Sequence, residues 1–247
     1  MKYYYLTDES EKSLAPFFSK MVLSASLACV VIVGICVLMF WPRQPLGGYI
    51  MADKVPFVFF LIFGATLIVS CYINIYCGRG ETIPRFYFIR NQTDVPTFER
   101  ELDFLRYGLI QFVLHALILL LPFLPLLVLA ASVYVIPLIT FVQAVIIIYS
   151  ASLLCRLFAF MVYLFGGRLS TAGYLAARGF MIAFLFGTLF FGAAINPLQL
   201  LYMMNKSPQI PGWPFILHLV IVYSAILLLS VLNHRLVRRP MKSETTS

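Results

Sequence analysis

The stretch that decides the fold is YGLIQFVLHALILLLPFLPLLVLAASVYVIPLITFVQAVIIIYSASLLCRLFAFMVYLF, residues 107–165, in which Arg156 is the one charged residue. An α-helix rises about 1.5 Å per residue and a bilayer's hydrocarbon core is about 30 Å thick, so roughly twenty apolar residues cross it once. This stretch is long enough to cross twice. Three prolines interrupt it, and we expect the chain to reverse between Ala131 and Pro137.

The rest of the chain has the same character. Of its 247 residues 62% are hydrophobic and 11% are charged, whereas roughly a quarter are charged in soluble domains. No alternating ten-residue strand pattern occurs, so helices are the expected spanning element. The sequence therefore predicts an all-α membrane protein with a single transmembrane domain over residues 1–247. Its six predicted spans are residues 21–40, 55–76, 107–130, 137–163, 179–202 and 212–232.

The distribution of positive charge predicts the orientation in the membrane. Arg43, Lys54 and Lys206 fall on one side of the predicted spans, and the other fifteen of the 18 lysines and arginines fall on the opposite side. Cytoplasmic loops carry the excess of Lys and Arg, so we expect both termini in the cytoplasm. The net charge of +8 is explained by this topology, and no nucleic-acid partner is expected. The fifteen are Lys2, Lys12, Lys20, Arg79, Arg85, Arg90, Arg100, Arg106, Arg156, Arg168, Arg178, Arg235, Arg238, Arg239 and Lys242.

A charged segment lies in the predicted cytoplasmic connector, residues 77–106. Its second half, TDVPTFERELDFLRYG (residues 93–108), has the pattern of a short amphipathic helix that Asp94 could cap. From Asp94 to Asp103 four acids accompany one base, whereas a helix on anionic headgroups carries a basic face. We therefore expect this helix to bind a protein; an interfacial helix without a partner is the alternative. The predicted docking residues are Asp94, Phe98, Glu99, Arg100, Glu101, Leu102, Asp103 and Leu105.

The N-terminus is expected to form another amphipathic helix, because Leu14, Phe17, Phe18 and Met21 share a face. No chemistry of an enzyme is expected. The glycine-rich loop that ends in Gly-Lys-Ser/Thr and holds phosphates does not occur, and the five cysteines form no CxxC pair. We therefore expect no catalytic residue, no metal and no cofactor in this chain. If ATP drives the protein, another chain binds the nucleotide.

Two motifs within the spans are candidates for a function. Gln111 and His115 lie one turn apart on the third span, where they could line a polar pathway or form a hydrogen bond between helices; the second interpretation is favoured. Asn196 and Pro197 open the sequence NPL at the end of the predicted fifth span. Water channels need two Asn-Pro copies, and this chain has one, so that class is rejected.

The layout resembles the permease subunits of type-2 ABC exporters. The residues that carry the resemblance are FERELDFLRYG followed by a Leu/Pro-rich span, and Asn196-Pro197-Leu198 late in the chain. The resemblance implies six spans in the bacterial inner membrane, a coupling-type helix between spans two and three, and a second permease subunit, identical or paralogous. It also implies a separate ATPase subunit that holds ATP and Mg²⁺. The alternative is a non-transporting six-span scaffold or assembly factor, which would have no ATPase gene beside its own.

Overall fold

The computed structural model describes residues 55–80, 110–133, 136–166, 171–206 and 212–238, together with seven isolated helical positions between 24 and 35. These segments are almost wholly helical and include no strand, which confirms the all-α class for the described part. The elements are α3 (Val55–Gly80), α6 (Ile110–Leu120), η2 (Leu121–Phe123), α7 (Leu124–Val133), α8 (Leu138–Gly166), α9 (Thr171–Leu185), η3 (Gly187–Phe191), α10 (Pro197–Lys206) and α11 (Gly212–Arg238).

Within these residues, five helical segments are long and apolar enough to cross a membrane. This is compatible with a multi-pass membrane protein. The predicted first span, residues 21–40, and the connector helix lie almost entirely outside the described residues. The five segments are Phe60–Cys77, Phe112–Ser132, Leu138–Val162, Thr171–Phe191 and Gly212–Leu236.

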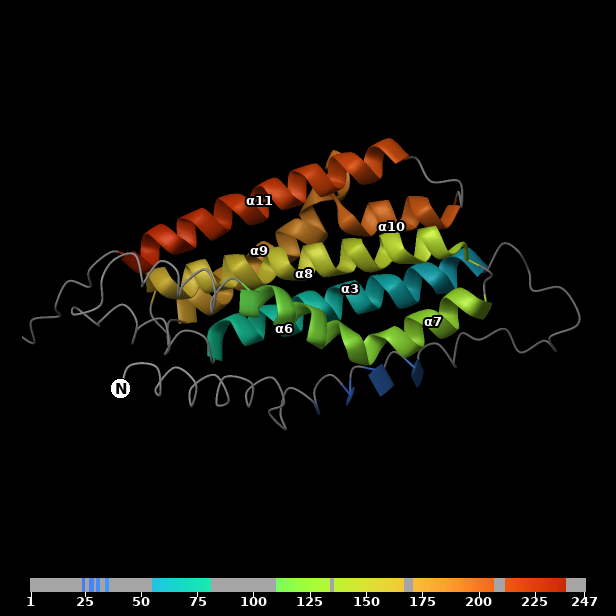
Figure 1. The fold of residues 1–247 in the computed structure, drawn as a ribbon, viewed down its shortest axis with the longest axis horizontal. Coiled ribbons are helices and arrows are strands. Elements are labelled where there is room, and N and C mark those ends of the chain that lie inside the picture. Colours follow the sequence, from blue (N-terminus) through green and yellow to red (C-terminus); the bar gives the residue numbers. More distant parts are fainter. Residues whose placement is uncertain are drawn as a thin grey trace, which may run out of the picture.

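The helices form an elongated antiparallel bundle with α3 and α8 at its centre (Figure 1). In α3, 61% of the candidate span is buried, against 22% in α11. Large side chains such as Phe63, Phe112 and Phe160 fill the core, and the rings of Phe112 and Phe160 lie 5.0 Å apart. The central pair therefore provides the scaffold, while α9 and α11 present most of their surface outward.

Prolines explain the bend and the reversal in the central stretch. Pro122 lacks an N–H and its ring crowds the preceding turn, so α6 passes into the short 3₁₀ segment η2 before α7 begins. At the far end, the Ile136 N–H donates to the Ala131 carbonyl (3.0 Å). The chain then reverses, and α8 starts directly after Pro137.

The segment predicted as one span at residues 179–202 has a different structure. It begins earlier, as α9 at Thr171, and is broken by η3 and a turn before α10. The break has a physical cause in two residues: Gly192 adopts φ 92°, which side-chain-bearing residues rarely adopt, and Pro197 cannot lie inside a continuous helix. The residues around the break are as apolar as the helices on either side, so the hydropathy of the sequence does not reveal it.

Candidate functional site

A row of buried polar side chains runs along the contact between α3 and α8. On α3, Thr66, Ser70 and Asn74 recur every fourth residue and therefore share one face. On α8, Ser152 and Arg156 have the same spacing. All five are buried at the most extensive helix contact of the bundle. We call these five residues, with His115 of α6, the polar row.

The serines join the two helices in the middle of the row. The Ser152 hydroxyl lies 2.8 Å from the Ser70 hydroxyl and 2.7 Å from the Ile148 carbonyl oxygen. The Asn74 side-chain amide donates to the Ser70 carbonyl (2.9 Å). Small hydroxyl residues let helices approach closely in a membrane, and these hydrogen bonds fix the register of α3 against α8.

Arg156 lies at one end of the row and is 2% exposed. Its guanidinium donates to the Asn74 side-chain oxygen (3.4 Å) and contacts Nδ1 of His115, and its carbon Cζ lies 5.1 Å from the centre of the Phe112 ring. An amide oxygen, an imidazole nitrogen and an aromatic face all offer electron density to a cation. For the guanidinium to donate to it, Nδ1 of His115 must be the unprotonated nitrogen.

This position changes the count of cytoplasmic cations. Arg156 was counted among the cytoplasmic cations although the predicted span 137–163 contains it, and it lies inside α8, within the candidate span Leu138–Val162. Arg178 lies likewise inside α9, within the candidate span Thr171–Phe191. The count of cations included both arginines because a count by side carries no signal of how deep a single arginine lies. Arg235 likewise lies within the candidate span Gly212–Leu236, so twelve cations remain on that side, against the three opposite.

The structure describes the side chain of His115 but not that of Gln111. The structure brings His115 of α6 against Arg156 of α8, so His115 contacts a neighbouring helix. Gln111 lies in the first turn of α6, and its side chain is outside the described part. A pathway lined by both residues stays a prediction.

Asn196 organises a second buried polar site, at the break between α9 and α10. Its side-chain oxygen accepts a hydrogen bond from the Gln199 N–H (2.7 Å), which caps the start of α10 ahead of Pro197. Its amide nitrogen donates to the carbonyl of Leu185 and to the hydroxyl of Thr188, both at 2.8 Å. One side chain therefore satisfies backbone groups at the end of one helix and the start of the next.

The helix α11 also contributes to this break. His218 is fully buried, and its Nδ1 lies 3.2 Å from the carbonyl oxygen of Ala194 in the turn. No carboxylate lies near His218 in the sequence to orient its ring. The structure supplies a backbone carbonyl from another segment, and only the fold brings that carbonyl near.

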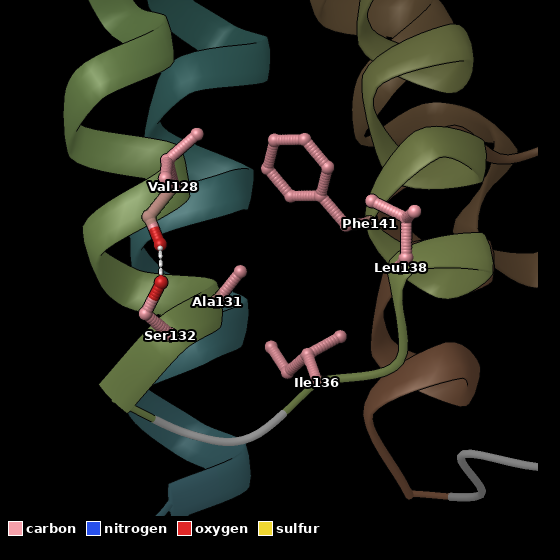
Figure 2. A pocket seen from close by; sticks show the side chains of 6 residues that line it. All are labelled: Val128, Ala131, Ser132, Ile136, Leu138 and Phe141. Carbon is pink, nitrogen blue, oxygen red and sulfur yellow. Dashed lines mark hydrogen bonds between the residues drawn. The ribbon is translucent and has the colours of Figure 1, made fainter.

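An apolar hollow of about 370 Å³ opens where α7 meets α8, at the end of the bundle far from Arg156 (Figure 2). Its one hydroxyl, of Ser132, already donates to the Val128 carbonyl (2.8 Å). The surface that remains is mostly apolar, and no titratable side chain lines it. The lining residues are Val128, Ala131, Ser132, Ile136, Leu138 and Phe141.

The remaining predicted site residues, from Asp94 to Leu105, lie outside the described residues. Within the described part of the chain, no three His, Cys, Asp or Glu side chains come close enough to hold a metal ion. The described cysteines, Cys71, Cys77 and Cys155, are buried and not in disulfides.

The fold and the two buried polar sites define a helical bundle with several candidate membrane spans. No protein-family model matches this chain, and no match was found among curated proteins or solved structures.

Proposed function

We propose that this chain is the permease subunit of an ATP-driven exporter of the type-2 ABC class. In this proposal it pairs with a second permease, identical or paralogous, and with a separate ATPase subunit that binds ATP and Mg²⁺. The observation that carries the proposal is the break between α9 and α10 that Asn196 holds. Discontinuous spanning helices are a recurrent feature of transporters, where the freed backbone groups lie at the pathway or at moving contacts.

The break lies at the depth of the membrane spans. A Cβ built on Gly64 of α3 would lie 3.5 Å from a methyl carbon of Leu198, and one turn further the rings of Tyr202 and Phe60 lie 5.6 Å apart. The helix α10 therefore runs antiparallel to α3, and its start is level with Gly64, inside the candidate span Phe60–Cys77. Irregular backbone at such depth needs protein or water around it.

The surface at the break supports the proposed second permease. On η3, Phe190 is 94% exposed and Phe191 is 69% exposed, so a short 3₁₀ segment that interrupts the α-helix lies at the surface of the single chain. Irregular backbone facing lipid is disfavoured, because lipid offers it no hydrogen bonds. A second permease subunit packed over η3 would remove this segment from the lipid.

The proposal places both termini in the cytoplasm of a bacterial cell, with the protein in the inner membrane. The support is the cation asymmetry, since α3 and α11 end, and α6 begins, at one end of the bundle (Figure 1). The segment from Asp94 to Leu105, between α3 and α6, would then face the ATPase.

A non-transporting scaffold is the second candidate, and the polar row favours it. Buried hydrogen bonds such as Ser70–Ser152 and Asn74–Arg156 fix one arrangement of helices. A protein that only organises others in the membrane needs such a rigid core and no moving part.

Co-purification separates the two candidates. The tagged chain would be isolated in mild detergent from its own organism, and its partners identified and assayed for ATP hydrolysis. The permease proposal expects a Walker-type ATPase in stoichiometric amount, with hydrolysis by the complex and none by the chain alone. Partners without any nucleotide-binding subunit would favour the scaffold.

A further inference from the structure

Five buried polar atoms around the break between α9 and α10 have no hydrogen-bond partner in the described part of the chain. Thr66 and His218 are fully buried and Thr140 is 2% exposed, while the two glutamines are half-buried with their side-chain oxygens inside the protein. Another such atom, Oδ1 of Asn233, lies toward the other end of α11. The five are Oγ1 of Thr66, Oγ1 of Thr140, Oε1 of Gln143, Oε1 of Gln199 and Nε2 of His218, and we call them the unpaired atoms.

The contact between α3 and α8 places three of the unpaired atoms close in depth. The rings of Phe63 and Phe141 lie 6.2 Å apart, edge to face. Thr66 follows Phe63 along α3 by about one helical turn. On α8, Thr140 directly precedes Phe141, and Gln143 lies just after it. Because α3 and α8 run in the same direction, these three side chains lie within about two helical turns of one another along the bundle (Figure 1).

The other two unpaired atoms lie at the same depth, on α10 and α11. A Cβ built on Gly64 of α3 would lie 3.5 Å from a methyl carbon of Leu198, and Gln199 is the next residue of α10. On α11, Nδ1 of His218 lies 3.2 Å from the carbonyl oxygen of Ala194, in the turn that leads into α10. Four helices therefore bring unpaired atoms to the depth of the break.

These atoms need a partner that donates hydrogen bonds. The amide oxygens of Gln143 and Gln199 only accept, and Nε2 of His218 accepts as well, since Nδ1 carries the proton that is donated to the Ala194 carbonyl. The threonine hydroxyls can donate or accept. Native proteins rarely leave a buried polar atom without a bond, because it loses its bonds to water on burial and gains none. The two serines of the polar row, by contrast, bond each other.

We propose that water enters the bundle at the end where α8 and α11 begin and supplies the hydrogen bonds of the unpaired atoms. Water is small, donates as well as accepts, and is the usual partner of buried polar atoms that the protein itself leaves unbonded. The distance is short, since His218 lies about 9 Å along α11 from Gly212 and Thr140 lies in the first turn of α8. Irregular backbone at the depth of a membrane is tolerated where it lines a water-filled cavity, so this water would also account for the break. The proposal holds for a permease and for a scaffold alike.

Substitutions of equal size test whether the threonine hydroxyls are hydrated. Thr66→Val and Thr140→Val replace a hydroxyl by a methyl group, in the full chain in mild detergent. If water bonds these hydroxyls, each variant should unfold about 2–4 °C below wild type, as expected for one lost hydrogen bond. In a dry site the same change removes an unbonded polar atom, and the unfolding temperature should stay the same or rise. Ser150→Ala is the control, because its buried hydroxyl bonds the Ile147 carbonyl of its own helix (3.1 Å) and its removal should change little.

Hydroxyl-radical footprinting tests for the water directly. Radicals that a short X-ray pulse forms from water oxidise the side chains in contact with that water. His218 should be oxidised several-fold faster than His115, which is also buried but lies in the polar row. Oxidation is read residue by residue from peptide masses, so it does not depend on the stability of a variant.

Three results would overturn the proposal. The first is an unchanged or raised unfolding temperature for both threonine variants, and the second is equal oxidation of the two histidines. The third concerns a cation, which a set composed mostly of acceptors could also hold. A rise in unfolding temperature with sodium chloride that choline chloride does not give would assign the site to that ion instead of water. If Thr66→Val does not fold, Thr140→Val and the footprint decide.

Discussion

The side-chain amide of Asn196 donates to the carbonyl oxygen of Leu185, 2.8 Å away, across the break that separates α9 from α10. Leu185 is the last residue of α9, so its carbonyl has no partner further along the helix. The residues are eleven positions apart in the chain and both are fully buried. This contact closes the turn and fixes where α10 begins.

Replacement of Asn196 by alanine should therefore destabilise the protein more than removal of another buried amide. Asn196→Ala removes a helix cap and leaves the Leu185 carbonyl without its bond, at a cost of about 2–4 kcal/mol. Asn233→Ala is the matched control, because Asn233 is equally buried and donates one bond, to the Leu157 carbonyl (3.1 Å). Unfolding midpoints in mixed detergent should fall further for Asn196→Ala. If both variants lose the same stability, the helix cap contributes no more than an ordinary buried hydrogen bond.

Gly192 gives a second test of the same turn. Its φ of 92° is strained for any residue with a Cβ, so Gly192→Ala should cost about 1–2 kcal/mol although no atom lies within 4 Å of the new methyl. Gly187→Ala is the control, since its Cβ would meet Ala183 at an ordinary 3.8 Å. The measurement is again the unfolding midpoint. A Gly192→Ala protein as stable as Gly187→Ala would mean that the turn relaxes without cost.

Arg156 and His115 should be energetically coupled. Arg156→Met keeps an unbranched apolar stem but removes every donor, and His115→Phe keeps a ring but removes the acceptor. In a double-mutant cycle the loss for the pair should be smaller than the sum of the single losses, with a coupling of about 1–2 kcal/mol. Arg156→Lys should not restore wild-type stability, because an ammonium cannot bond Asn74 and stack on Phe112 together. Additive losses would contradict a direct contact.

Much of the fold follows from the sequence because span length and hydropathy are local quantities. The predicted ranges 55–76, 137–163 and 212–232 correspond to one helix each, namely α3, α8 and α11. The reversal after α7 was also predictable, since prolines act on their own backbone. The interrupted α9–α10 segment was not. The conformation of Gly192 depends on the turn around it, and its neighbours are as apolar as those of a helical glycine.

The buried sites were less accessible to sequence reasoning than the spans. The spacing of Thr66, Ser70 and Asn74 shows that they share a face, yet it does not show which helix they meet. Arg156 was counted only as a cytoplasmic cation, because its partners, Asn74 and His115, are far away in the chain. Asn196 was singled out for a family resemblance, and its role as a cap emerges only when Leu185 and Gln199 are placed around it.

The orientation of the chain can be tested with single cysteines. A cysteine at position 92, in a variant without accessible native cysteines, should be protected from an impermeant thiol reagent in intact cells, and one at position 208 should be labelled. The expectation follows from the sequence, which has twelve cations on the predicted cytoplasmic side of the spans against three on the other. Lysed cells, in which both positions should react, are the control. Strong labelling at position 92 in intact cells would reverse the proposed topology.

The proposed coupling-type helix makes the most direct test of the permease function. At 100° per residue Phe98, Leu102 and Leu105 share one face, which would fill an apolar cleft on the ATPase, while Glu99 and Glu101 would lie at its polar rim. Such buried apolar anchors dominate binding energy. Phe98→Ala with Leu102→Ala should therefore release the ATPase subunit while membrane insertion is unchanged.

Phe104→Ala is the control for that double variant, because Phe104 lies off the shared face and should leave the complex intact. The amount of ATPase that co-purifies with each protein is compared with wild type, and the yield of monodisperse permease reports on folding. The charge of the segment makes a passive role on the membrane surface unfavourable, since its four acids would be repelled by anionic headgroups. If the double variant retains its ATPase as fully as Phe104→Ala does, this segment is not where the ATPase docks.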